Sequence, residues 1–326
     1  MIIQQFQQFV SRLNKLIIDE KSISVILGNN YFIISMLRIF TIKFIRINKL
    51  SDYLKQKQSL YIINYLQNTY SNIIEIYKNI KTKNNIQQIP RNVYVCWLQG
   101  EENAPIIVKK CIDNIRMSFP TCNIIILTEK NWRSYCSLPI HILDKYKNNI
   151  ITPTHFSDIL RLSLLSNNGG LWIDATVLVT NSISMSLFEC DFFSIANSSY
   201  SDNISRRRWT TYLLAADKDS IIVKFVYDML CEYWKNENIA INYYFMDYIF
   251  HIGYIQIEHF RNIINSIPKS NPNCLKLSSL LNQPFDKNIW ESITKDTYFH
   301  KLSWKIHLND KYSNDTTFWN YIEEHF

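Results

Sequence analysis

Glycine and the glycine-containing catalytic motifs are nearly absent from this sequence. The 326 residues include only five glycines. The motifs typical of P-loop nucleotide-binding proteins, zinc metalloproteases, serine hydrolases and dinucleotide-binding domains do not occur, so the sequence gives no support to these enzyme classes. The first residues also lack a basic region and a small-residue cleavage site, and we therefore expect no secretory signal.

Long hydrophobic runs and paired cysteines are missing as well. The most apolar window, residues 31–47, contains Arg38, Lys43 and Arg46, whereas a membrane-spanning helix needs about 20 apolar residues with few charges. The seven scattered cysteines form no C-x-x-C pair, which favours reduced thiols in a cytosolic protein. The net charge of +7 suits acidic partners such as nucleotides, but no basic stripe with interleaved aromatics indicates nucleic acid.

The residues that are present favour a folded chain of two parts. Hydrophobic residues make up 47% of the sequence and aromatic residues 14%, which is enough to exclude global disorder. Apolar residues recur at steps of three and four through residues 1–80, the spacing of helices. The polar run 81–88 resembles a linker. We therefore predict an N-terminal helical subdomain over residues 1–86 and a second domain over 87–326.

The second part alternates between strand and helix patterns. The expected strands are residues 92–98, 124–127, 171–179 and 192–196. A helix is expected to begin near Pro105 and another to run over residues 155–166, ending at the breaker Gly169-Gly170. Residues from about 220 onward are expected to be mostly helical. This alternation predicts an α/β layered fold with a mainly parallel central sheet.

Asp174 is the first candidate for a ligand-binding or metal-binding residue because it directly follows an apolar strand. Open α/β sheets bind ligands outside the carboxyl ends of their strands. A carboxylate there can hold a divalent cation that neutralises a diphosphate, and it can equally cap a turn. Position alone does not separate the two interpretations.

Asp158 and Arg161 are three residues apart on the expected helix and therefore share one face. They fit either a surface ion pair or a site that binds sugar hydroxyls and donor oxygens, and taken alone the surface pair is favoured. Trp97 fits base stacking or core packing. His300 and the run 206–208 (three arginines) each fit an ordinary structural role at least as well as ligand binding.

Taken together, several blocks resemble the capsular polysaccharide synthesis protein family. The blocks are residues 89–100, 101–111, 155–161 (HFSDILR), 164–165, 169–176 (GGLWIDAT), 232–235, 242–248 (NYYFMDY), 281–286 and 300–302. The family is a branch of glycosyltransferases with a GT-A-like nucleotide-sugar-binding fold. It is similar to a wider group that includes yeast initiating mannosyltransferases and clostridial glucosylating toxins.

The resemblance implies roles for individual residues at a nucleotide-sugar donor. Trp97 would stack on the donor base, and Asp158 would hold donor hydroxyls. Arg161 would bind the donor sugar or its diphosphate oxygens. Gln99 and Gly170 would also lie against the donor.

The resemblance further implies a metal and an acceptor side. Asp174 would ligate Mn²⁺ or Mg²⁺ bridging the diphosphate. The usual motif is Asp-x-Asp, whereas here the third position is Thr176, whose hydroxyl is a poor direct ligand but would hold a metal-bound water. His300 would supply a compensating metal ligand. Asp247 is the candidate acceptor-side catalytic group, although a solvent-facing position on an amphipathic helix explains it equally well.

The expected activity is transfer of a hexose, with retained anomeric configuration, from a UDP-sugar to a capsular or lipid-linked glycan acceptor. We expect a cytoplasmic protein, with peripheral contact to the inner membrane face through the N-terminal helices as one option and burial of those helices as the favoured option. Two alternatives stay open. One is a non-catalytic, membrane-associated component of polysaccharide assembly, and the other is a toxin-like protein glycosyltransferase.

Overall fold

The computed structural model describes residues 34, 37, 48–80, 88–197, 203–308 and 316–326. The strands are β1 (Asn92–Cys96), β2 (Asn123–Leu127), β3 (Gly170–Ile173), β4 (Val177–Val179), β5 (Phe192–Ser194), β6 (Leu213–Ala216) and β7 (Phe299–Lys301). The α-helices are α4 (Asn48–Thr69), α5 (Ser71–Lys78), α6 (Ile106–Ser118), α7 (Ile140–Lys147), α8 (Pro153–Asn168), α9 (Ile221–Asn236), α10 (Phe245–Gln256), α11 (Glu258–Ser266), α12 (Lys287–Thr294) and α13 (Phe318–His325).

The central sheet has five strands in the order β2-β1-β3-β6-β5. Strands β1, β2 and β3 pair in parallel, whereas β6 pairs antiparallel with both β3 and β5. Only β6 therefore runs against the other strands. The predicted α/β fold with a mainly parallel sheet is confirmed.

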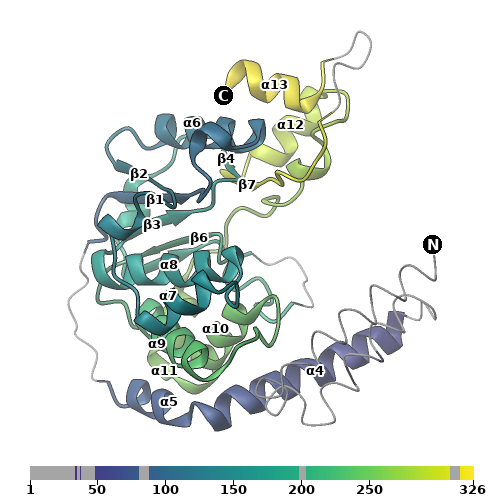
Figure 1. The fold of residues 1–326 in the computed structure, drawn as a ribbon. Helices are drawn as coiled ribbons and strands as arrows, with labels where there is room; N and C mark the ends of the chain where they lie inside the picture. Colours follow the sequence, from purple (N-terminus) through teal and green to yellow (C-terminus); the bar gives the residue numbers. More distant parts are fainter. Residues whose placement is uncertain (1–33, 35–36, 38–47, 81–87, 198–202, 309–315) are drawn as a thin grey trace.

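Both faces of this sheet are covered, because apolar residues occupy both sets of alternating strand positions. Val93 and Val95 of β1 pack into the cluster that contains the buried face of α6, whereas Tyr94 packs into the opposite cluster. Figure 1 shows α6 over one face of the sheet and α7 to α11 over the other. The site described below lies at the strand ends between these layers.

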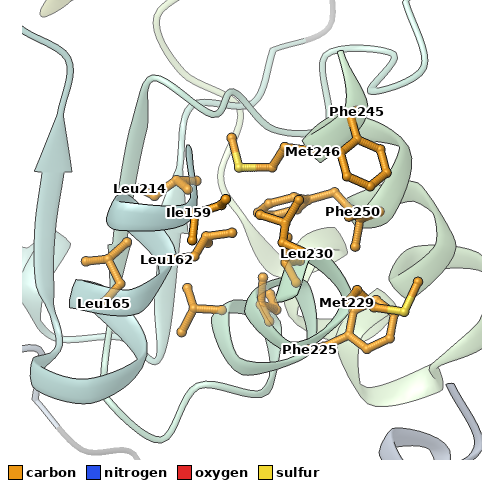
Figure 2. Close-up of a cluster of buried hydrophobic side chains, with 14 of the residues drawn as sticks. Ile159, Leu162, Leu165, Leu214, Phe225, Met229, Leu230, Phe245, Met246 and Phe250 are labelled. Carbon is orange, nitrogen blue, oxygen red and sulfur yellow. The ribbon is translucent and has the colours of Figure 1, made fainter. Parts of the chain in front are cut away.

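Helix α8 packs between the sheet and helix α9 through a nearly continuous apolar surface. Its Ile159, Leu162 and Leu165 are fully buried and meet Phe225 and Phe250 of the neighbouring helices α9 and α10 (Figure 2). The helix begins at the cap Thr152, whose side chain accepts a hydrogen bond from the backbone of His155. It ends at Gly169, where φ is 65° and a Cβ would lie 2.7 Å from Pro90.

The N-terminal helices lie along α9 and α10 (Figure 1). Ile62 and Leu66 of α4 join the same core cluster, and Tyr77 of α5 donates a hydrogen bond to Asp228 at 2.6 Å. The stretch expected as one helix over residues 52–80 is broken at Tyr70 into α4 and α5. The proposed boundary at residue 86 stays a prediction.

The candidate membrane-docking stretch, residues 31–47, falls outside the described residues except at positions 34 and 37. Within the described part of the chain, no helix combines the length and the apolar character needed to cross a bilayer.

The strand expected over residues 171–179 is wrong as a single element. It is two strands in two sheets, because β3 belongs to the central sheet and β4 pairs with β7. The break is a turn over residues 174–176, closed by a hydrogen bond from the N–H of Val177 to the carbonyl of Asp174 at 3.0 Å. Asp174 therefore lies at the edge of the sheet, and β7 approaches it from a distant part of the sequence.

Candidate active site

The carboxylate of Asp174 is the centre of a charged cluster, which also contains Asp158, Arg161 and Lys301. Its Oδ2 lies 2.5 Å from Nζ of Lys301, and its Oδ1 lies 3.1 Å from Nη2 of Arg161. Oδ1 also accepts a hydrogen bond from Nε1 of Trp172 at 2.9 Å. Burial opposes the negative charge, but Lys301 and Arg161 outweigh it and hold the pKa of Asp174 below its usual value.

Arg161 is buried, with 5% of its surface exposed. Its guanidinium donates to the backbone carbonyl of Thr211, lies 3.4 Å from Oδ1 of Asp158, and stands 4.9 Å from the ring centre of Trp172. The predicted shared face of Asp158 and Arg161 is confirmed, but it points into the protein rather than to solvent. A surface ion pair is therefore excluded for these two residues.

Asp158 occupies a different electrostatic environment from Asp174. Burial and the negative charges of Asp174 and Asp247 raise its pKa to about 7, against the lowering effect of Arg161. A carboxyl group with this pKa exchanges its proton readily near neutral pH. Asp158 can therefore donate or accept a hydrogen bond at a sugar hydroxyl.

Asp247 belongs to the same neighbourhood through helix α10. Its Oδ1 accepts a hydrogen bond from Nε1 of Trp209 at 2.8 Å. Burial raises the pKa of Asp247 to about 6, although the Trp209 hydrogen bond and the charge of Arg161 lower it. The alternative of a solvent-facing carboxylate is wrong, because Asp247 faces the charged cluster.

Trp97 directly follows β1, as Asp174 directly follows β3, so both lie at the carboxyl edge of parallel strands. Trp304, which is 46% exposed, meets Trp97 edge-to-face with ring centres 5.9 Å apart. Nε1 of Trp97 is buried and has no hydrogen-bond partner in the described part of the chain. Gln99 is exposed in the loop after β1, where its backbone carbonyl accepts from Asn103.

The predicted role of Gly170 in donor binding stays a prediction, but the structure places this residue away from Asp174. Gly170 begins β3, whereas Asp174 follows its end, so about four residues at 3.3 Å each separate the two positions. A Cβ at Gly170 would lie 2.6 Å from the carbonyl oxygen of Asn92, and φ is 122°. Glycine is required here for the close approach of β1 and β3.

The predicted role of His300 as a metal ligand stays a prediction, but the structure gives this residue a structural environment. Its ring is fully buried, and its Nε2 lies 3.1 Å from Oγ1 of Thr180 and 3.2 Å from the carbonyl of Thr297. Alternate side chains of a strand point to opposite faces, so Lys301 faces Asp174 while His300 faces away. Burial lowers the pKa of His300 to about 4, which fits a neutral structural histidine.

The side chains around Asp174 fit a divalent cation poorly. Mg²⁺ and Mn²⁺ prefer oxygen ligands, but the two carboxylate oxygens meet the nitrogen donors of Arg161, Trp172 and Lys301. Thr176 is buried in the turn. Within the described ranges, no group of three His, Cys, Asp or Glu residues is arranged to hold a metal ion.

Sequence reasoning missed Lys301, Trp172, Trp209 and Trp304. Lys301 lies inside a segment that resembles the family, but 127 positions separate it from Asp174, and nothing local indicates the contact. Trp172 and Trp209 are identified by the carboxylates that accept from their indole N–H groups, and Trp304 is identified by its ring contact with Trp97.

The arginine run 206–208 does not reach this cluster as a set. Arg208 packs on Tyr254 and donates to the carbonyl of Ile204.

A pocket of about 520 Å³ beside Phe285 and Phe318 is lined by none of the candidate residues.

Comparison with known proteins identifies the family. The model of the family described as "Capsular polysaccharide synthesis protein" matches residues 41–322. No curated protein matches the sequence. Among solved structures, a chain described as "PaToxG Glycosyltransferase" is similar with 13% identity and a TM-score of 0.39, over 78% of this chain and 100% of that one. The family match spans most of the sequence and includes every residue of the charged cluster, and the chain therefore belongs to the capsular polysaccharide synthesis protein family.

Proposed function

We propose that this protein is a glycosyltransferase that moves a sugar from a nucleotide-sugar donor to a glycan acceptor. One observation carries the proposal. Arg161 and Lys301 converge on Asp174 beside Asp158, at the carboxyl edge of the parallel strands. Family membership supports a role in capsular polysaccharide synthesis.

The chemistry follows from where charge develops. The bond between the sugar C1 and the donor phosphate oxygen breaks, and its electron pair stays on the departing nucleoside diphosphate. The acceptor hydroxyl oxygen forms the new bond to C1 and loses its proton. Fixed positive groups stabilise the departing phosphate, and Arg161 and Lys301 are the cations held at this edge of the sheet.

The two remaining carboxyl groups have different proposed roles because they lie at different places around the site. Asp158 would hold donor hydroxyls beside Arg161. Asp247 would face the acceptor, and its pKa of about 6 leaves it mostly ionised at neutral pH, as a group that accepts a proton should be. Trp97, with Gln99 nearby, would contact the donor base.

The resemblance to GT-A-like enzymes favours a UDP-sugar, a hexose as the transferred group, and retention of anomeric configuration. A capsular polysaccharide or a lipid-linked glycan is the acceptor class that the family favours. These finer assignments are proposals that a donor screen can test.

The test is a thermal-shift screen of the full chain with UDP-, GDP- and CMP-sugars, with and without Mn²⁺. At a donor concentration about 100 times Kd, binding stabilises the folded state by about 2.7 kcal/mol, which raises Tm measurably. Asp158→Ala should lose most of the shift. Asp113→Asn is the matched control, because Asp113 is exposed on α6, where its carboxylate pairs with Arg116 outside the charged cluster.

The alternative is a non-catalytic component of polysaccharide assembly. The poor fit of a metal to the Asp174 site is the observation that favours it. Absence of any shift with all three donor classes would contradict the glycosyltransferase proposal and favour this alternative.

A further inference from the structure

The ammonium of Lys301 lies against Oδ2 of Asp174, the carboxylate that the family resemblance assigns to a metal. The residue ends β7, whose pairing with β4 is fixed by the register Val177 to Lys301. Its backbone N–H donates to the carbonyl of Cys274 at 2.7 Å. The side chain is about one quarter exposed, and its Nζ lies 2.5 Å from Oδ2 of Asp174, which anchors the ammonium.

Arg161 holds the other oxygen of the same carboxylate. It is anchored more rigidly than Lys301, because Thr211, Asp158 and the Trp172 ring all contact its guanidinium. Two cations therefore flank one carboxylate, with Asp158 as the second acidic neighbour. Lysine binds phosphate as a compact point charge, and arginine binds it through a planar fork.

We propose that Lys301, together with Arg161, supplies the positive charge that binds the donor diphosphate, so that donor binding and sugar transfer proceed without a divalent cation. This inference rests on the proposed glycosyltransferase function. In the transfer step the Lys301 ammonium keeps its proton and donates a hydrogen bond to the departing phosphate. Asp174 is then a positioning residue that holds the two cations.

The test is isothermal titration of the full chain with UDP and with GDP, each in EDTA and in Mn²⁺. The wild-type protein should bind one of them with similar affinity in both buffers. Lys301→Met should weaken binding in EDTA roughly tenfold to a hundredfold, as expected for loss of one charge-assisted contact. Lys301→Arg should retain most of the affinity.

Lys287→Met is the matched control, because Lys287 is 80% exposed and pairs with Glu291 on α12, outside the charged cluster. Its affinity should equal that of the wild type. Circular dichroism checks that each variant is folded. If Lys301→Met does not fold, the affinities of the wild type and of Lys301→Arg in EDTA and in Mn²⁺ are compared instead. Similar affinities in the two buffers support the inference, and binding only in Mn²⁺ contradicts it.

Two results would overturn the inference while leaving the proposed function intact. One is binding that appears only when Mn²⁺ is present. The other is a folded Lys301→Met variant that binds in EDTA as tightly as the wild type. Failure of both nucleotides to bind in either buffer, together with no shift from any sugar donor in the thermal-shift screen, would instead contradict the proposed function, and this inference with it.

Discussion

The guanidinium of Arg161 lies 3.1 Å from the carboxylate of Asp174, which joins helix α8 to the turn after β3. The contact is buried on the arginine side, where only 6% of the side-chain surface is exposed. A buried charge that loses its partner is costly, because the remaining charge stays desolvated. The cluster is therefore expected to matter for stability as well as for activity.

We predict that Arg161→Met lowers the free energy of unfolding by about 3 to 5 kcal/mol. The cause is that Asp158 and Asp174 would remain buried without their shared cation. Urea unfolding measures the change. Arg133→Met is the control, since Arg133 is 60% exposed beside Glu129, and its effect should stay below about 1 kcal/mol. Equal effects of the two substitutions would contradict the prediction.

Asp158 should make the stability of the protein depend on pH. Its pKa in the folded state is about 7, above its ordinary value of 3.8, so the folded state binds more protons than the unfolded state between these two pH values. Stability from this group is therefore lost as pH rises from about 4 to about 7. The substitution Asp158→Asn removes the titrating carboxyl group and therefore removes this loss of stability with rising pH.

We expect the stability of Asp158→Asn relative to the wild type to increase by about 2 kcal/mol between pH 5 and pH 8. Urea unfolding at the two pH values gives the comparison. A difference that is the same at both pH values would show that Asp158 does not titrate in this range.

Gly170→Ala should destabilise the fold by roughly 2 to 4 kcal/mol, because the new Cβ meets the Asn92 carbonyl and φ is unfavourable for alanine. Asn167→Ala, on the exposed end of α8, should change stability by less than about 0.5 kcal/mol. Denaturant unfolding measures both. Folded Gly170→Ala protein should bind the donor with the affinity of the wild type. Loss of donor binding by the folded variant would show that Gly170 contributes to the donor site.

Trp97→Ala should weaken donor binding by about 1 to 3 kcal/mol, the usual value for one base stacked on an aromatic ring. Trp97→Phe should keep most of the affinity, because phenylalanine retains a flat aromatic face. Titration with the donor found in the screen measures both variants. A folded Trp97→Ala protein with unchanged affinity would show that Trp97 only packs against Trp304.

Much of the fold follows from local patterns in the sequence. The apolar strands β1 and β2 and the helix after Pro105 are read from residue type and spacing. Strand β6 was missed because Leu-Leu-Ala-Ala lacks the β-branched residues typical of strands. The break after β3 was missed because the apolar run continues through it, and only the pairing of β4 with β7 shows where it ends.

The site is predictable where its parts are close in the sequence. The spacing of Asp158 and Arg161 places them on one helix face, and Asp174 follows its strand directly. The position of Lys301 depends on a strand pairing across 127 residues, which no local pattern encodes. The resemblance to GT-A enzymes points to the neighbouring His300, whereas strand alternation turns His300 and Lys301 to opposite faces.

The proposed role of the charged cluster is tested most directly by release of nucleoside diphosphate from the UDP- and GDP-sugar donors, compared between the wild type and Asp174→Asn. Asn replaces the carboxylate that positions Lys301 and Arg161 with a neutral group of the same shape. We predict release by the wild type from one donor and a loss of about 100-fold in folded Asp174→Asn. Release by Asp174→Asn at the wild-type rate, or no release by the wild type from any donor with or without Mn²⁺, would contradict it.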